Sequence, residues 1–579
     1  MTPHRRIPNM SRTRTDRPGA NLLNSKKWIR SSTRRTLRRR IFARDVSLFA
    51  VVLCFVCSPA RAQSSVGEVA FANSGAPAAQ KDFLYGLAQL HNFEYEDAAA
   101  AFSRAEAIDP NFAMAYWGEA MTFNHPIWDE QERHPARGAL QKLAATPEER
   151  LAKAKTEREK DYLRAVEILY GEGAKYDRDA RYADFMRGLH EKYPDDIDAT
   201  CFYALSLLGT AHNGRDVPTY MRAAALLEDV FYAHPRHPGA AHYLIHSFDD
   251  PTHAILGLRA AEAYSKIAPE AAHAQHMTSH IFLALGMWDE VVSANETAMG
   301  IVNRERAAAG KPPHYCGHYN LWLEYGYLQQ GRFANAMRIL AGCRAEAVAQ
   351  PVGGRVSSAV DPDNTFAGSF TQMRAHYLIE TKDWSGEAAN WKIPAGAPAS
   401  AQFMFLYTDA LGACRRNDAA AAHTLLSQMQ ALEPQLNADL DRERYSGDNW
   451  MRKVPGILTD QIQGLVLLQR NDLEQAGAAF QKAADEEASL PSAFGPPLIA
   501  KPSHELLGEF LLERGNAADA RQAFETGLAR APRRVEALQD LQRAQTLLED
   551  PAAAQTGATL HQIYAHADHA TQPSSGTKQ

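Results

Sequence analysis

Two H-x-x-x-H pairs lie 34 residues apart in this 579-residue chain: His242 with His246, and His276 with His280. Side chains four residues apart lie on one face of a helix, so each pair marks one helix face. A fixed period of this length is typical of stacked helical units, each of which contacts only its neighbours. The spacing therefore predicts that the two faces occupy equivalent places in successive units and turn to a common side.

The same period recurs in small, aromatic and proline positions along the chain. It is clearest in Gly508, Ala520, Phe524 and Pro532, and it appears first in Gly86, Ala98, Phe102 and Pro110. Small residues let the two helices of a unit approach each other, and the proline ends the second helix because it cannot continue the hydrogen-bond ladder. About ten such copies between residues 79 and 534 predict an all-α protein.

These positions resemble the signature of the tetratricopeptide repeat superfamily, W-x2-L-G-x2-Y, then A-x3-F, then P within 34 residues. The resemblance implies a right-handed α-solenoid of about ten helix-turn-helix units over residues 79–545, with a concave groove that receives ligands. The phrases H-Y-L-I-H at 242–246, H-M-T-S-H-I at 276–281 and K-P-S-H-E-L at 501–506 resemble a bacterial exported subgroup. That second resemblance implies a fold and a surface, but no reaction.

The first 62 residues have the composition of an export signal. Arginines at 34–40 precede an apolar run over 46–56, and A-R-A at 60–62 ends the segment in A-x-A form. The apolar run is too short to span a bilayer comfortably, so we expect cleavage and a periplasmic or secreted protein without a membrane span. R-R-I-F at 39–42 resembles a twin-arginine core, which leaves both Sec and Tat export open.

The segments that flank the repeats and the net charge of the chain allow two further predictions. Residues 63–78 are expected to be a linker, and residues 546–579, where the period is lost, a disordered tail. The signal holds 15 Lys and Arg against 2 Asp, so the rest of the chain has 47 basic and 66 acidic residues, a net charge of −19. Such a surface should repel nucleic acid, so we expect no nucleic-acid partner.

Five histidines are predicted to meet in the groove, around residues 198–280. They are His242, His246, His273, His276 and His280. The resemblance places them at positions 2, 5 and 9 of their units, which line the groove in this superfamily. Neighbouring packed helices lie about 8–10 Å apart, so imidazoles from two helices can share one ion. Imidazole suits zinc, copper, iron and nickel, so the ligand type predicts a transition metal without choosing one.

Other residues are weaker candidates for the groove. They are Cys201, His376, His91, His125, His504 and Glu505. His91 and His125 also lie 34 residues apart, but near a helix end, where a histidine often contacts the last carbonyls. H-E at 504–505 begins like a zinc H-E-x-x-H motif, but Gly508 stands where the second histidine belongs. Lone histidines are interpreted as hydrogen-bonding or partner-contacting residues: His212, His318 and His423.

Cys316 and Cys343 are predicted to approach each other. They lie just before position 1 and at position 27 of one unit, and positions that sum to about 28 face each other in an antiparallel hairpin. The two thiols are then within disulfide reach, and the alternative is a pair of buried small residues. No C-x-x-C-H occurs, so covalent haem is not expected.

The sequence thus predicts an exported all-α solenoid whose histidine groove binds a transition metal such as copper, zinc or iron. The alternative is a metal-free scaffold that captures a protein or peptide in the groove. A metal-dependent oxidoreductase that uses open metal positions is a third possibility. No P-loop, G-x-S-x-G elbow or paired G-x-G-x-x-G occurs, so no motif demands an enzyme.

Overall fold

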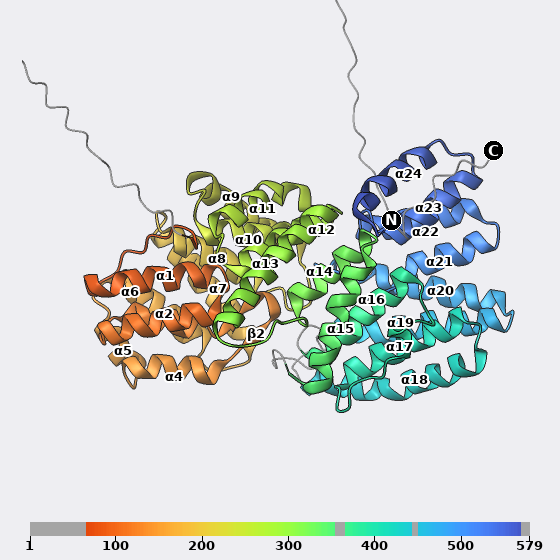
Figure 1. Ribbon diagram of the computed structural model, residues 1–579. Coiled ribbons are helices and arrows are strands. Elements are labelled where there is room, and N and C mark those ends of the chain that lie inside the picture. The colour runs from red at the N-terminus through yellow and green to blue at the C-terminus, as the bar shows by residue number, and fades with distance from the viewer. Residues whose placement is uncertain (1–64, 354–364, 443–449, 569–579) are drawn as a thin grey trace, which may run out of the picture. The chain divides into compact units, whose positions relative to one another are not determined.

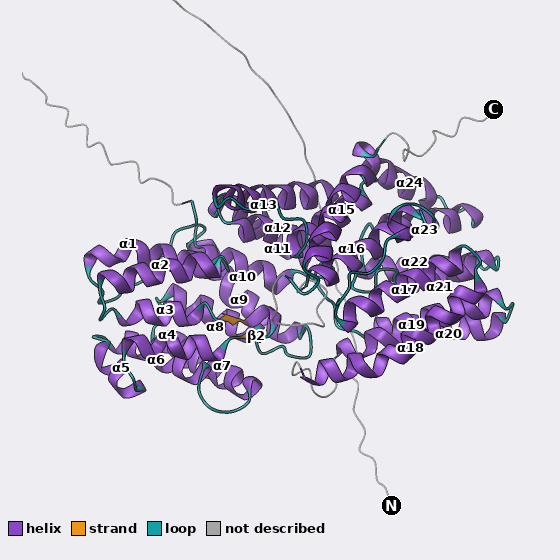
Figure 2. Cartoon of the chain, turned by 60° about the horizontal axis from the view of Figure 1, so that its bottom comes forward, coloured by secondary structure: helices purple, strands orange, loops and turns teal. Residues whose placement is uncertain are grey.

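The computed structural model describes residues 65–353, 365–442 and 450–568, which are helical almost throughout (Figures 1 and 2). The first helices are α1 (Gln80–His91), α2 (Tyr95–Ile108), α3 (Ala113–Met121), α4 (Arg133–Leu143), α5 (Pro147–Lys153), α6 (Glu157–Leu169), α7 (Lys175–Lys192), α8 (Ile197–Leu208) and α9 (Val217–Ala233). A short antiparallel pair, β1 (Asn124–His125) and β2 (Glu130–Gln131), lies between α3 and α4.

The middle of the chain continues in the same way. It contains α10 (Pro238–Phe248), α11 (Ala254–Ile267), α12 (Ala272–Ala284), α13 (Trp288–Ala308), α14 (His318–Gln329), α15 (Phe333–Ala349) and α16 (Phe366–Thr381). The last helices are α17 (Ala399–Arg415), α18 (Ala419–Arg442), α19 (Lys453–Gln469), α20 (Leu473–Ala488), α21 (Ser503–Glu513), α22 (Ala517–Arg530), α23 (Val535–Leu547) and α24 (Ala552–Ile563).

Consecutive helices pack against each other along most of the chain. α1 contacts α2, α10 contacts α11, α12 contacts α13, and α21 contacts α22. Each pair then packs on the next, as α11 does on α12 and α22 on α23. The predicted all-α solenoid is therefore confirmed.

Phenylalanines at the repeat positions fill the space that glycines leave between helices. A Cβ placed on Gly86 would lie 3.0 Å from the Phe102 ring, and one on Gly118 would lie 2.4 Å from it. Near the C-terminus, a Cβ on Gly508 would lie 2.5 Å from the Phe524 ring. These contacts are the close helix approaches that the repeat pattern predicts.

Gly118→Ala is expected to destabilise the protein by about 1–3 kcal/mol, because the new methyl group overlaps the buried Phe102 ring. Gly138→Ala on α4 is the matched control, since a Cβ there meets nothing within 4 Å. The control is expected to gain up to about 1 kcal/mol from the lower entropy of the unfolded chain. Denaturant unfolding measures both changes, and an equal response of the two variants would refute this packing account.

Both ends of the described chain differ from the sequence prediction. The expected linker is packed, because Val66 and Phe71 are buried and Glu68 N donates to the Arg236 carbonyl at 3.0 Å. The expected disordered tail instead forms α24, since Leu560 and Ile563 are apolar enough to be buried on the core. The predicted signal at 1–62 and residues 569–579 lie outside the described residues.

No helix among the described residues is both long enough and apolar enough to cross a bilayer.

Candidate metal centre

Two packed helices bring the five predicted histidines together. α10 carries His242 and His246, and α12, which contacts it, carries the other three. α10 begins at Pro238, whose fixed φ suits a first helical position, and the His237 side chain caps it by accepting from Ala240 N.

From the sequence we expected the five histidines to line an open groove, but in the structure they are buried. They are between 0% and 4% exposed. Aromatic rings from distant segments cover them: Phe93 lies 4.3 Å from His242 between ring centroids, and Trp322 and Phe494 lie 4.4 and 5.1 Å from His280. Residues 489–502, which connect α20 to α21, supply Phe494.

Hydrogen-bond acceptors fix the protonation of the Nδ1 atoms. His242 Nδ1 donates to the His91 carbonyl oxygen at 2.7 Å. His246 Nδ1 and His280 Nδ1 both donate to Asp249 Oδ2, at 3.2 and 2.9 Å. A carbonyl or carboxylate oxygen cannot donate, so each of these rings holds a proton on Nδ1, and a ring in its neutral form carries its lone pair on Nε2.

His276 has the same arrangement through an amide. Its Nδ1 lies 2.6 Å from Asn295 Oδ1, and Asn295 Nδ2 donates to the Val291 carbonyl at 2.8 Å. The amide is thereby oriented with its oxygen toward the ring, and His276 Nδ1 must donate. His273 Nδ1 lies 3.1 Å from the Tyr319 hydroxyl.

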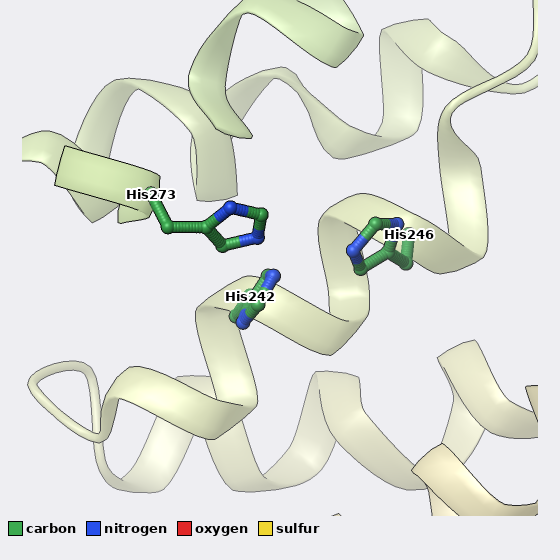
Figure 3. A group of neighbouring side chains, drawn as sticks. All are labelled: His242, His246 and His273. Atoms are coloured by element: carbon green, nitrogen blue, oxygen red, sulfur yellow. The ribbon is translucent and has the colours of Figure 1, made fainter. Parts of the chain in front are cut away.

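Ring nitrogens of six histidines lie together in two groups of three. The first triad is His242, His246 and His273, and the second triad is His276, His280 and His318; within each, ligand atoms lie within 4.8 Å of one another. Figure 3 shows the rings of the first triad directed toward one another from two helices. All three Nε2 atoms of that triad are buried and have no hydrogen-bond partner among the described residues.

The second triad contains a close contact between two imidazole nitrogens. His276 Nε2 and His280 Nε2 lie 3.2 Å apart. Both nitrogens carry lone pairs, because both Nδ1 atoms donate elsewhere. The two triads are adjacent, with ring centroids 5.4 Å apart for His246 and His280.

Burial favours the neutral form of four of these imidazoles. It lowers the pKa of His242, His273 and His276 well below the usual value, and neighbouring imidazoles lower it further. Burial also lowers the pKa of His280 to about 4, although Asp249 opposes this shift. Burial by itself would raise the pKa of Asp249, but Arg215 and the two histidines hold it well below its usual range. The neutral His280 ring thus donates to an ionised carboxylate.

His318 belongs to the site, although it was interpreted from the sequence as a lone contact residue. It is the first residue of α14, and its ring centroid lies 4.6 Å from that of His276. If Ala336 is position 20 of its unit, His318 occupies position 2, as His273 does in its own unit. That shared position is the signal that would have found it.

His91 and Cys201 support the site without joining it. Both ring nitrogens of His91 have partners, the Tyr243 hydroxyl and Asp198 Oδ1, each at 2.9 Å, and its carbonyl orients His242. Cys201 Sγ lies 3.8 Å from His237 Nδ1, and burial raises the pKa of this thiol well above its usual value.

The structure does not bring the other four weak candidates to the triads. His125 contacts the Thr122 carbonyl at 3.1 Å, and His376 contacts the Pro497 carbonyl at 3.1 Å. Glu505 lies in a buried ion pair with Arg534, and its neighbour His504 adjoins a separate pocket.

Cys316 and Cys343, which are 27 residues apart in the sequence, form a disulfide. Their positions in the helix hairpin predicted this contact. Cys201 and Cys414 are free thiols.

A cavity of about 700 Å³ adjoins the centre, and one histidine of each triad, His273 and His318, lines it.

Comparisons with known proteins give no functional assignment. No protein-family profile and no curated protein matches the chain. It is similar to Cut9 in the APC/C heterotetramer Cut9-Hcn1, with 13% identity over 82% of this chain and 78% of that one, and a TM-score of 0.33. It is also similar to the human IFIT1 dimer with m7Gppp-AAAA, with 11% identity over 86% and 92%, and a TM-score of 0.33.

A third similar structure is the P58(IPK) TPR domain, with 14% identity over 82% of this chain and 98% of that one, and a TM-score of 0.20. Because all three TM-scores are low, these similarities assign no function to the chain. The chain's own helices and the contacts between successive helix pairs define an all-α solenoid. Its distinguishing feature is the buried six-histidine centre formed by the two triads.

Proposed function

We propose that this protein binds transition-metal ions in the six-histidine centre, one ion at each triad. The proposal rests on the contact between His276 Nε2 and His280 Nε2 at 3.2 Å. Two lone pairs at that distance repel each other unless a cation lies between them. Two nitrogens bound to one tetrahedral zinc at about 2.0–2.1 Å would lie about 3.3 Å apart, so the spacing suits a shared ion.

The surroundings of the rings support the same conclusion. A metal-binding histidine almost always donates its other N–H to a carboxylate, a backbone carbonyl or water. Here His242 donates to a carbonyl, and His246 and His280 donate to one carboxylate. A polar nitrogen buried without a partner is costly in a metal-free protein, and the first triad contains three such Nε2 atoms among the described residues.

Three imidazoles per ion leave a coordination position open, as in catalytic rather than structural zinc sites. An open position is also what a metal-dependent oxidoreductase would require. Imidazole ligands suit zinc, copper, iron and nickel, so metal analysis has to choose among them.

Untagged protein offered copper, zinc, iron and nickel is expected to retain about two ions per chain after removal of free metal, because each triad groups three histidine ring nitrogens. Plasma emission spectrometry of the protein measures this ratio. Retention of none of the four metals would overturn the proposal. The metal-free scaffold that captures a peptide in its groove would then take first place.

We also propose that the protein is located outside the cytoplasm. The export-like segment at 1–62 supports it, as does the Cys316–Cys343 disulfide, because disulfides persist in oxidising compartments. Exported protein is expected to begin at or near Gln63 by N-terminal sequencing, and non-reducing peptide mapping is expected to link these two cysteines. A soluble cytoplasmic protein that retains residues 1–45 would contradict this.

A further inference from the structure

The cavity of about 700 Å³ touches both triads. His273 of the first triad and His318 of the second line it, whereas the other four histidines lie behind them. An ion bound at either triad would therefore share one ligand residue with the cavity wall. The position that three imidazoles leave open can then be filled from the cavity.

Aromatic side chains dominate the wall of this cavity. They are Phe93, Trp128, Tyr220, Tyr319, Trp322, Phe366, Trp450 and Phe494. Aromatic rings prefer edge-to-face or offset contacts with other rings, so this wall favours a planar aromatic guest. Small-molecule pockets commonly enclose about 300–1,000 Å³, so the cavity has the size of such a site.

The charges of the wall disfavour an anion. Glu96 and Asp129 are acidic, and Arg215 already pairs with Asp249 and Asp250. The described wall residues include no lysine and no second arginine. A carboxylate or phosphate would therefore meet acidic groups and no unpaired guanidinium or ammonium group among the described wall residues, and only the bound ions would attract it.

We propose that the cavity binds a small aromatic alcohol of the phenol class, which is uncharged in solution. Its oxygen takes the open metal position and releases its O–H proton to solvent, while its ring packs on the aromatic wall. This inference rests on the proposed metal function. It adds a substrate class to that function, because the metal selects the oxygen donor and the wall selects the ring.

Calorimetric titration with three probes tests the two parts of this recognition. Phenol has both the ring and the donor, cyclohexanol has only the donor, and toluene has only the ring. Metal-loaded protein is expected to bind phenol at least about tenfold more tightly than either of the others. Metal-free protein is expected to lose that preference for phenol over toluene.

A cavity-filling variant tests the location. Val302 on α13 lines the cavity and is not a proposed ligand, so Val302→Trp should weaken phenol binding at least about tenfold with metal content unchanged. Val348→Trp is the matched control, since Val348 is 58% exposed on α15 and lies outside the cavity. The control should bind phenol as the wild type does.

The outcomes separate the two proposals. Protein that retains metal but binds phenol no better than cyclohexanol and toluene overturns this inference alone, as does normal phenol binding by a folded Val302→Trp variant. Protein that retains no metal overturns the proposed function and this inference with it. The three-probe comparison uses the wild type, so it decides the matter even if the tryptophan variant does not fold.

Discussion

Protein in which His242 and His276 are both replaced by alanine is expected to retain no stoichiometric metal and to keep its helical content. Each substitution removes one ligand from one triad, since His242 belongs to the first and His276 to the second. Loss of a ligand should exceed the 10–100-fold loss of affinity that is typical of a lost supporting hydrogen bond, so we expect more than about 100-fold at each triad. Metal analysis and far-ultraviolet circular dichroism measure the two effects.

The single variants sharpen this test. His242→Ala and His276→Ala should each lower the metal content from about two ions per chain to about one. His376→Ala is the matched control, because His376 is equally buried, at 1% exposure, but contacts the Pro497 carbonyl instead of either triad. The control should keep both ions. A double variant that still binds two ions would show that the triads are not the site.

The repeat pattern predicted the fold because its determinants are local. Gly118 must lack a side chain where the Phe102 ring packs, and these two residues are only 16 positions apart. Contacts between residues this close in the sequence recur in each repeat, so their pattern is visible in a single sequence. The ends of the solenoid could not be read in this way, since α24 is held by burial of Leu560 and Ile563 and carries no repeat signature.

The candidate site was predicted in part. The 34-residue spacing identified four of the six histidines, and helix spacing on one face added His273. His318 was missed because the extra residues at 302–313 separate it from His276 by 42 positions. Asp249 and Asn295, which fix the imidazole tautomers, lie on no repeat position that distinguishes them, so only the fold reveals their role.

The burial of the histidines was not predictable from the repeat. In a simple solenoid their face would be open to solvent. Phe494 covers His280 from a segment more than 200 residues later, because the C-terminal hairpins return to the middle of the array. Trp288 Nε1 donates to the Arg533 carbonyl at 3.1 Å, and Val535 N donates to Gln329 Oε1 at 2.9 Å, which ties the start of α23 to α13 and α14.

Arg534 is the central charged group of this return contact. Its side chain is fully buried and pairs with Glu380 of α16 at 2.5 Å and Glu505 of α21 at 2.6 Å. It also donates to the Tyr325 hydroxyl of α14 at 2.9 Å. One guanidinium therefore joins three helices that are far apart in the sequence.

Arg534→Met is expected to lower the free energy of unfolding by about 3–5 kcal/mol, because it keeps most of the volume but leaves Glu380 and Glu505 buried without this cation. Arg543→Met is the control: that arginine pairs with Asp540 but its side chain is 67% exposed, so a change within about 0.5 kcal/mol is expected. Adding Glu380→Gln and Glu505→Gln to Arg534→Met should restore part of the stability, since the loss of the Arg534 charge beside these carboxylates and not the lost volume causes the defect. Chemical denaturation of the four proteins measures these differences. Equal effects of Arg534→Met and Arg543→Met, or no recovery in the triple variant, would show that the return contact is held by packing and not by the buried charge pairs.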